Sequence, residues 1–207
     1  MVISQNAGVV IVGSGLGGYT LARELHKLAP ATPITVITAD GGEAYSKPSL
    51  SNALAQGKGI TALTQKTAAQ VAADLSATVL PRHRVARIDR GAKRLVVRQP
   101  DGGEIEVAYD RLVLALGADP RPYVVAGSDT VPVVSVNDLD DYAAWRDALT
   151  SGRRVLLIGA GLIGCEFAND LASAGYAVTA VDPAPWPLGR LLPEELGREL
   201  AGALEAS

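Results

Sequence analysis

The sequence predicts an α/β fold in which two units of similar construction follow one another along a chain of 207 residues. Two observations lead to this prediction. The stretch VVIVGSGLGG at 9–18 is nearly repeated as VLLIGAGLIG at 155–164, and each begins with an apolar run typical of a parallel strand covered on both faces. Between the repeats, the pattern changes to short alternating runs separated by turn residues, which is typical of antiparallel strands.

Composition excludes several classes of protein. Hydrophobic residues make up 48% of the chain and charged residues 20%, and the net charge is −3. A slightly acidic chain argues against a nucleic-acid partner, because phosphate binding needs a basic surface. A single cysteine excludes an internal disulfide, and no cluster with metal-ligand spacing is present. The apolar runs are shorter than the ~18 residues of a membrane span and no secretory signal is evident, so we expect no membrane span and a cytoplasmic location.

The first unit is expected to contain a strand, a helix and a second strand, followed by a meander and a return strand. Leu21, Leu25 and Leu28 share one face of the first predicted helix. The predicted elements are strand 9–12, helix 17–28, strand 34–38, loop 41–59, helix 62–75, an antiparallel meander of strands 84–89, 94–99 and 104–109, and strand 111–118.

The second unit repeats the opening of the first. After a crossing segment at 119–127, a helix is predicted at 137–149, with Asn137 or Asp138 as its N-cap. Strand, helix and strand follow over 155–182, then a loop and a last helix at 194–206. These are few elements for a whole unit, so we expect the second unit to be incomplete. The predicted division is 1–119 and 120–207.

The first glycine-rich stretch has the spacing GxGxxG between a strand and a helix. In this motif the first glycine allows a tight turn, the second lets a pyrophosphate approach the backbone, and the third lets helix and strand pack closely. It predicts a Rossmann-like dinucleotide site, although glycines can serve the turn alone. The ribose contact is expected from Asp40, about 20 residues further on, or from the backbone of its neighbours. The predicted binding residues are Gly13, Ser14, Gly15, Leu16, Gly17, Gly18, Thr38, Ala39 and Asp40.

The second glycine-rich stretch has the same spacing and a cleaner acidic partner. Asp182 stands at the end of the following strand, where a carboxylate accepts hydrogen bonds from both ribose hydroxyls of NAD and repels the 2′-phosphate of NADP. The pattern therefore favours NADH, and the alternative for Asp182 is a turn residue before Pro183. The predicted binding residues are Gly159, Gly161, Leu162, Ile163, Gly164 and Asp182.

Two such motifs, separated by a meander and by YDRLVLALGADPRP at 109–122, resemble the two-dinucleotide-binding flavoproteins, the FAD-dependent pyridine nucleotide-disulfide oxidoreductase family. The resemblance extends over essentially the whole chain. It implies that FAD binds the first motif and the nicotinamide dinucleotide the second, with Gly117 at a cofactor-binding position. Leu116 stands where the family usually has threonine.

The loop EAYSKPSLSN at 43–52 contains no cysteine, unlike that of the thiol-dependent members, and Cys165 is expected to be a packed residue of the second unit. Together with GAGLIGCEFANDL at 159–171, this loop is most similar to that of the rubredoxin reductases. The resemblance implies that Lys47 and Pro48 lie against the flavin, and that Lys47 stabilises the reduced ring. It also implies that Glu166 lies near the flavin–nicotinamide junction, where it could pair with Lys47, and that the backbone of Val85 contacts adenine.

Each of these residues has a plainer alternative. Lys47 could be an exposed loop lysine, Glu166 a solvent-facing helix residue and Val85 a strand core residue. A basic run within 82–98 could be a docking face for an acidic carrier or a solvated meander.

The resemblance implies an NADH-dependent flavoprotein reductase with Lys47 and Glu166 as its catalytic residues. Electrons would pass from NADH through FAD to a small one-electron carrier, expected to be rubredoxin. One alternative is a reductase for the ferredoxin of an oxygenase system. Another is a nucleotide-binding fragment without turnover, because no counterpart of the family's later Gly-Asp segment is found and the chain resembles the N-terminal half of a longer protein.

Overall fold

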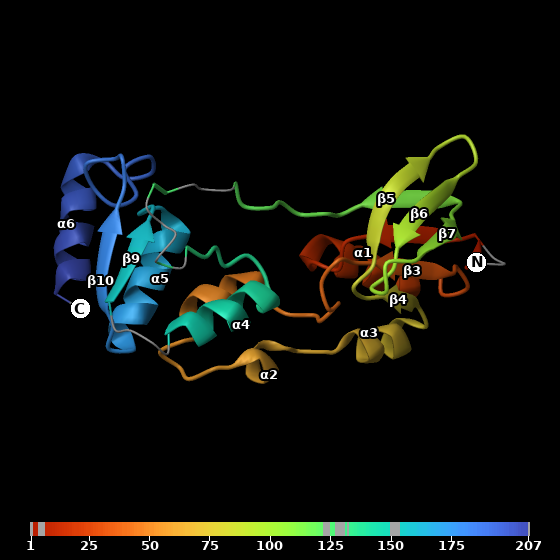
Figure 1. Ribbon diagram of the computed structural model, residues 1–207, viewed down its shortest axis with the longest axis horizontal. Coiled ribbons are helices and arrows are strands. Elements are labelled where there is room, and N and C mark those ends of the chain that lie inside the picture. Colours follow the sequence, from red (N-terminus) through yellow and green to blue (C-terminus); the bar gives the residue numbers. More distant parts are fainter. Residues whose placement is uncertain are drawn as a thin grey trace. The chain divides into compact units, whose positions relative to one another are not determined.

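The computed structural model describes residues 2–3, 7–121, 125–126, 131, 133–149 and 154–206. The chain divides into two compact units, shown in Figure 1. The first unit contains Met1–Ser46 and Thr64–Arg121, and the second contains Lys47–Leu63 and Pro122–Ser207. The chain therefore passes from the first unit into the second at Lys47 and returns at Thr64. Sequence patterns alone place 47–63 with the first unit.

A four-stranded parallel sheet is the centre of the first unit. Its strand order is β4-β3-β2-β8. Alternate residues of β2 face opposite sides: Ile11 packs with Tyr19 of helix α1, whereas Val10 and Val12 pack with the meander. Both faces are covered, which explains the apolar run without alternation. The bounds are β2 Val9–Val12, α1 Leu16–Leu28, β3 Ile34–Ile37, α3 Ala68–Leu75, β4 Thr78–Leu80 and β8 Arg111–Leu114.

The predicted antiparallel meander is confirmed. It consists of β5 Arg84–Asp89, β6 Arg94–Arg98 and β7 Glu104–Ala108, and β1 Val2–Ile3 adds a parallel strand beside β7.

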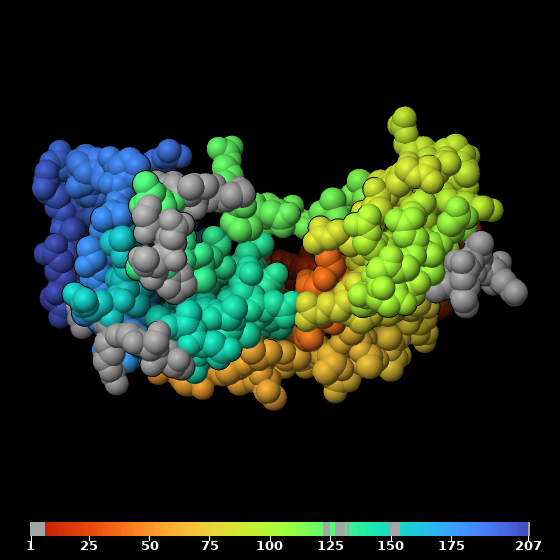
Figure 2. All heavy atoms as spheres, in the orientation of Figure 1, coloured from red at the N-terminus to blue at the C-terminus, as the bar shows by residue number. Residues whose placement is uncertain are grey.

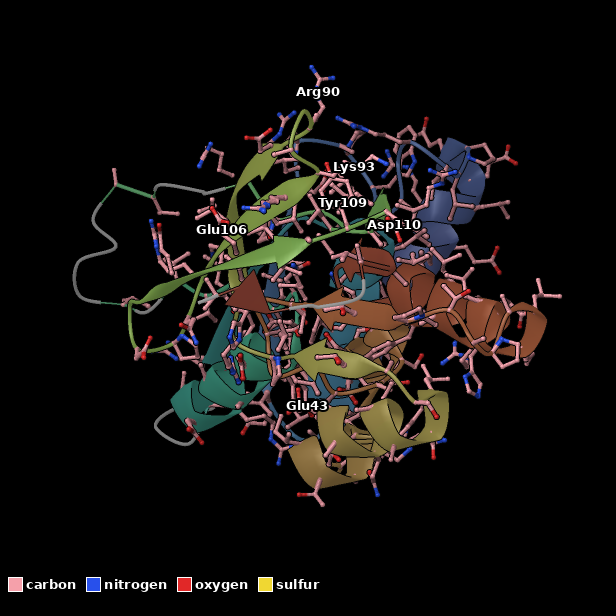
Figure 3. The ribbon with its side chains drawn as sticks, turned by 90° about the vertical axis from the view of Figure 1, so that its right-hand side faces the viewer. Glu43, Arg90, Lys93, Glu106, Tyr109 and Asp110 are labelled. Atoms are coloured by element: carbon pink, nitrogen blue, oxygen red, sulfur yellow. The ribbon has the colours of Figure 1, made fainter. Side chains whose placement is uncertain are left out.

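The outer face of the meander is polar. Leu95 and Val97 of β6 are fully buried against the parallel sheet, whereas Arg94 turns outward and pairs with Glu106 of β7 at 2.9 Å. Figure 3 shows Glu106 on the meander and Arg90 at the tip of the turn that joins β5 to β6. Part of the basic run is therefore used in exposed cross-strand ion pairs, each of which contributes little stability.

The second unit contains a parallel pair of strands, β9 Arg154–Ile158 and β10 Ala177–Val181, joined by α5 Leu162–Ser173. Helix α4 spans Leu139–Ala148 and α6 spans Glu194–Glu205. The side chain of Asp138 caps α4 by accepting a hydrogen bond from the Asp141 amide at 2.8 Å. Asp138 is one of the two residues predicted as the cap. Trp145 of α4 packs edge-on against Phe167 of α5, with the ring centroids 5.2 Å apart.

The helix predicted at 62–75 is in fact two helices. Helix α2 covers Ile60–Leu63, and α3 begins at Ala68. Thr67 and Gln70 form a capping box that starts α3, and Lys66 pairs with Ala44 in an isolated β-bridge. The cap and the bridge stabilise a non-helical backbone before Ala68, so the helix is interrupted there. Within the described residues, no helix is long and apolar enough to cross a membrane.

Tyr19 provides a test of how α1 is packed. Its side chain is 2% exposed and its hydroxyl donates to the carbonyl of Gly42 at 2.5 Å. Burial, followed by the charges of Asp40 and Glu43, raises the pKa of Tyr19 from 10.0 to about 12.

Because the unfolded chain loses the Tyr19 proton first, we expect the free energy of unfolding to fall as pH rises from 10.0 towards about 12. The Tyr19→Phe variant is the reference, because the other tyrosines titrate both in this variant and in the unaltered chain. Urea unfolding across this range should show a shallower decline for the variant. Parallel declines would contradict the assignment.

Candidate functional site

The turn between β2 and α1 is built from glycines with different roles. Gly13 has φ of +111°, and a Cβ there would collide with the carbonyl of Ala115. A Cβ on Gly18 would collide with the carbonyl of Gly13. Nothing lies within 4 Å of the Cβ position of Gly15 or Gly17. The first and third motif glycines are thus required by packing, whereas the second faces open space into which a ligand can approach the backbone.

The N-terminus of α1 has no side-chain cap. Gly15 occupies the N-cap position without a capping hydrogen bond from a side chain, and Leu16 is 82% exposed. The first amides of a helix have no partner within the helix and favour an anion. The open glycine and the uncapped helix therefore fit the pyrophosphate of a dinucleotide.

Asp40 ties this turn to the end of β3. Its Oδ1 accepts hydrogen bonds from Ser14 Oγ at 3.0 Å, from Thr38 Oγ1 at 2.6 Å and from the Gly42 amide at 2.9 Å. Ser14 and Thr38 are buried, and their hydroxyls are 3.0 Å apart. The predicted residues Ser14, Thr38 and Asp40 are therefore brought together, with Asp40 as an anchor of the loop. Ala39 lies between them and is exposed.

The segment before β5 also reaches the end of β3. The amide of His83 donates to the carbonyl of Thr38 at 2.9 Å, and the amide of Arg82 donates to that of Asp40 at 2.8 Å. These bonds lead into Val85, which is half-buried and packs against the core beneath the meander. Sequence patterns gave no sign of the contacts at Arg82 and His83, since they depend on where β4 ends.

The second glycine turn repeats the first. Gly159 has φ of +108°, and a Cβ on Gly164 would collide with the Gly159 carbonyl. Gly161 again has nothing within 4 Å of its Cβ position, and it is the N-cap of α5 without a side-chain bond. The next residues, Leu162 and Ile163, are exposed. The open Gly161 and the uncapped α5 therefore also fit the pyrophosphate of a dinucleotide.

Asp182 holds this second turn. Its Oδ2 accepts from the Ala160 amide and its Oδ1 from the Ala184 amide, each at 2.8 Å. These two hydrogen bonds, together with the charge of Arg190, hold the pKa of Asp182 below 3.8. A carboxylate oxygen has two lone-pair sites, so each oxygen can accept a further bond from a ribose hydroxyl. The loop after β10 closes the arrangement, as the amide of Leu188 donates to the Ala160 carbonyl at 2.9 Å.

Glu166 lies one turn into α5 and is exposed. Its Oε2 accepts a short hydrogen bond from the hydroxyl of Ser51, in the short helix η1 at Lys47–Asn52. Lys47 and Pro48 are exposed at the start of η1. Among the residues that the structure describes, the partner of Glu166 is thus Ser51 rather than Lys47. Ser51 was not singled out in the sequence, because nothing in it predicts that η1 packs on α5.

Two further predicted features have simple structural settings. Gly117 is exposed beyond β8 with φ of +70°. The sulfur of Cys165 lies 3.4 Å from the carbonyl of Ala160, and burial, followed by the charge of Asp182, raises its pKa. A raised pKa disfavours the reactive thiolate. No group of three or more potential metal ligands is found in the described part of the chain.

The chain is similar in sequence to known proteins. Residues 7–207 match the sequence profile of the family described as pyridine nucleotide-disulphide oxidoreductase. The chain is 41% identical over 201 residues to the rubredoxin-NAD(+) reductase of Acinetobacter baylyi, covering 96% of this chain and 51% of that protein. It is 43% identical over 197 residues to that of Alcanivorax borkumensis, covering 93% and 50%.

The fold is also similar to a solved structure, the covalent putidaredoxin reductase–putidaredoxin complex. The TM-score is 0.83 at 28% identity, and the match covers 98% of this chain and 48% of that one. The chain spans about half the length of the curated relatives it matches.

The two kinds of glycine in the first turn should respond oppositely to alanine. Gly13→Ala should lower the free energy of unfolding by ~3 kcal/mol, because it adds a collision at a positive φ. Gly17→Ala should raise it by up to ~1 kcal/mol, because Gly17 is helical and open. Urea denaturation of both variants measures the difference, and equal losses would refute the assignment of roles.

Asp182 should titrate below its ordinary pKa of 3.8. The interaction stabilises the fold above that pH and is lost as pH falls through the lower folded-state pKa. NMR titration of the carboxyl carbon measures the value, and Asp182→Asn should flatten the acid limb of the stability profile. A titration at or above 3.8 would show that the two amide bonds do not form.

Proposed function

The chain belongs to the pyridine nucleotide-disulphide oxidoreductase family, and we propose that it forms the cofactor-binding part of an NADH-dependent flavoprotein reductase. FAD binds at Gly13–Gly18 and NADH at Gly159–Gly164. The observation that supports this most directly is the pair of turns with one geometry, in which Gly15 and Gly161 both leave open space before an uncapped helix. In chain order, the FAD-binding part is 1–119, of which 47–63 packs in the second unit, and the NADH-binding part is 120–207.

The chain's residues act mainly by binding and orienting. When bound, the flavin accepts a hydride and releases single electrons, which is chemistry that side chains do not supply. The glycine turns hold the two pyrophosphates, and Thr38, Ala39, Asp40 and the backbone of Val85 are proposed to contact the ribose and adenine of FAD. Gly117 lies at the end of the FAD-binding part. The raised pKa of Cys165 supports a reaction without a thiol relay.

Asp182 supports the choice of NADH over NADPH. Its pKa is lowered, so the carboxylate is charged at neutral pH and would repel a 2′-phosphate. Lys47 and Pro48 are proposed to contact the flavin, where the ammonium group of Lys47 stabilises negative charge. Glu166 is proposed to act at the nicotinamide side, held by Ser51.

The proposed electron acceptor is rubredoxin. The relatives from Acinetobacter baylyi and Alcanivorax borkumensis, at 41% and 43% identity, are named rubredoxin-NAD(+) reductases. A ferredoxin of an oxygenase system is the second candidate, favoured by the similarity to the ferredoxin reductase for the CYP199A2 system of Rhodopseudomonas palustris, at 27% identity and a TM-score of 0.84. Mixing the reduced protein with each carrier and following carrier reduction separates the two. A cytoplasmic location belongs to the same proposal.

The proposal is tested by absorbance. The purified chain should show the visible band of bound flavin, and NADH should bleach it much faster than NADPH does. A colourless protein that takes up no added FAD would favour the alternative of a nucleotide-binding fragment without turnover.

A matched pair of variants separates the two sites. Gly15→Val should weaken FAD binding at least ~10-fold without unfolding the chain, because the added Cβ has no protein atom within 4 Å and the side chain starts in the space expected for the ligand. Gly161→Val should keep FAD but lose bleaching by NADH, for the same reason at the second turn. Titration with FAD and with NADH measures each. Loss of FAD in both variants, or in neither, would contradict the assignment.

A further inference from the structure

Helix α5 contains a buried carboxylate that the proposed hydride transfer does not use. Asp170 is 4% exposed. Its Oδ2 accepts a hydrogen bond from the amide of Leu54 at 2.8 Å, and its Oδ1 accepts one from the amide of Ala55 at 2.9 Å. Both amides follow η1 directly in the sequence. A buried carboxylate with two backbone donors is a strong anchor, because charge-assisted hydrogen bonds exceed neutral ones.

One helical turn earlier, Glu166 accepts the hydrogen bond from Ser51. Residues four apart share a helix face, so the two carboxylates form a row along the segment 47–55. Ser51 is 4% exposed, and its hydroxyl also lies 3.1 Å from the carbonyl of Pro48. The hydroxyl has one proton, and its donation to Glu166 attaches that carboxylate to η1 four residues after Lys47.

Helix α4 holds the same segment further along. Tyr142 is fully buried and its hydroxyl donates to the carbonyl of Lys58 at 3.1 Å, and Arg146 Nη1 donates to the same oxygen at 3.0 Å. Figure 2 shows the orange and gold atoms of this stretch lying along the teal α4. The segment is thus attached to the second unit at Ser51, at Leu54–Ala55 and at Lys58.

We propose that Asp170 is a positioning residue that, together with the Ser51–Glu166 hydrogen bond, sets the placement of Lys47 from the helix that begins at the NADH-binding turn. Lys47 is exposed, so its placement comes from the backbone of η1. The first turn of α5 holds the dinucleotide, and its later turns hold the segment that begins with Lys47. One rigid helix thereby fixes both. This role rests on the proposed function, in which Lys47 contacts the flavin.

The anchor is tested first without any cofactor. Asp170→Asn keeps the volume but leaves one acceptor oxygen for two amides. Amide hydrogen exchange over 51–58 should become about tenfold faster in this variant, with the exchange of β2 and β3 unchanged. Asp138→Asn is the matched control, since Asp138 also accepts from a backbone amide in the same unit but on α4. Unchanged exchange over 51–58 in Asp170→Asn would overturn the proposal.

The functional consequence is tested on the FAD-loaded chain by rapid mixing with NADH. Asp170→Asn and Ser51→Ala should each slow flavin reduction by about tenfold, while the dissociation constant for NADH changes less than about twofold. The split between rate and affinity separates positioning from general loss of structure. Faster exchange with an unchanged reduction rate would overturn the positioning role. Failure of the unaltered chain to bind FAD or react with NADH would instead count against the proposed function, and the exchange result would still decide whether Asp170 anchors the segment.

Discussion

The contact between the third motif glycine and the carbonyl of the first is the constraint on which both units depend. Gly18 meets Gly13, and Gly164 meets Gly159, so closely that neither helix could start where it does with a Cβ in between. Because each helix starts there, the second glycine of each motif is left facing open space. The open space at the second glycine and the close packing at the third are thus two consequences of the same absence of side chains.

In each unit, an aspartate that follows the strand after the helix stabilises the glycine turn. The hydrogen-bond donor differs between the two units. In the first unit, Asp40 accepts from the side chain of Ser14, and in the second, Asp182 accepts from the backbone of Ala160. Ser14 and Ala160 occupy the same position of the motif. The serine hydroxyl allows Asp40 to stand further along the loop, whereas alanine requires the carboxylate to reach the backbone itself. The two aspartates therefore differ both in their distance from the motif and in the donors from which they accept.

The segment 47–63 begins with Lys47 and lies in the second unit. It is expected to contact the flavin, and it packs on α4 and α5 of the unit that contains the NADH turn. Lys47 then takes its position from α5, the helix proposed to bind the electron donor. The carboxylates of Glu166 and Asp170 are then best understood as parts of one row along α5, with Ser51, Leu54 and Ala55 as its donors.

The sequence by itself determined the α/β fold, the two glycine turns, the meander and a helix cap at either Asn137 or Asp138, and the structure selects Asp138. Each of these depends on residues close in the chain, such as glycine spacing, apolar periodicity and turn residues. Only the tertiary structure decided that 62–75 breaks into two helices, that Asp40 anchors a loop and that Glu166 bonds to Ser51. It also decided that Asp170 holds Leu54 and Ala55. Apart from the capping box of Thr67 and Gln70, which is local, these outcomes join residues far apart in sequence, and the packing that brings them together leaves no periodic pattern in the sequence.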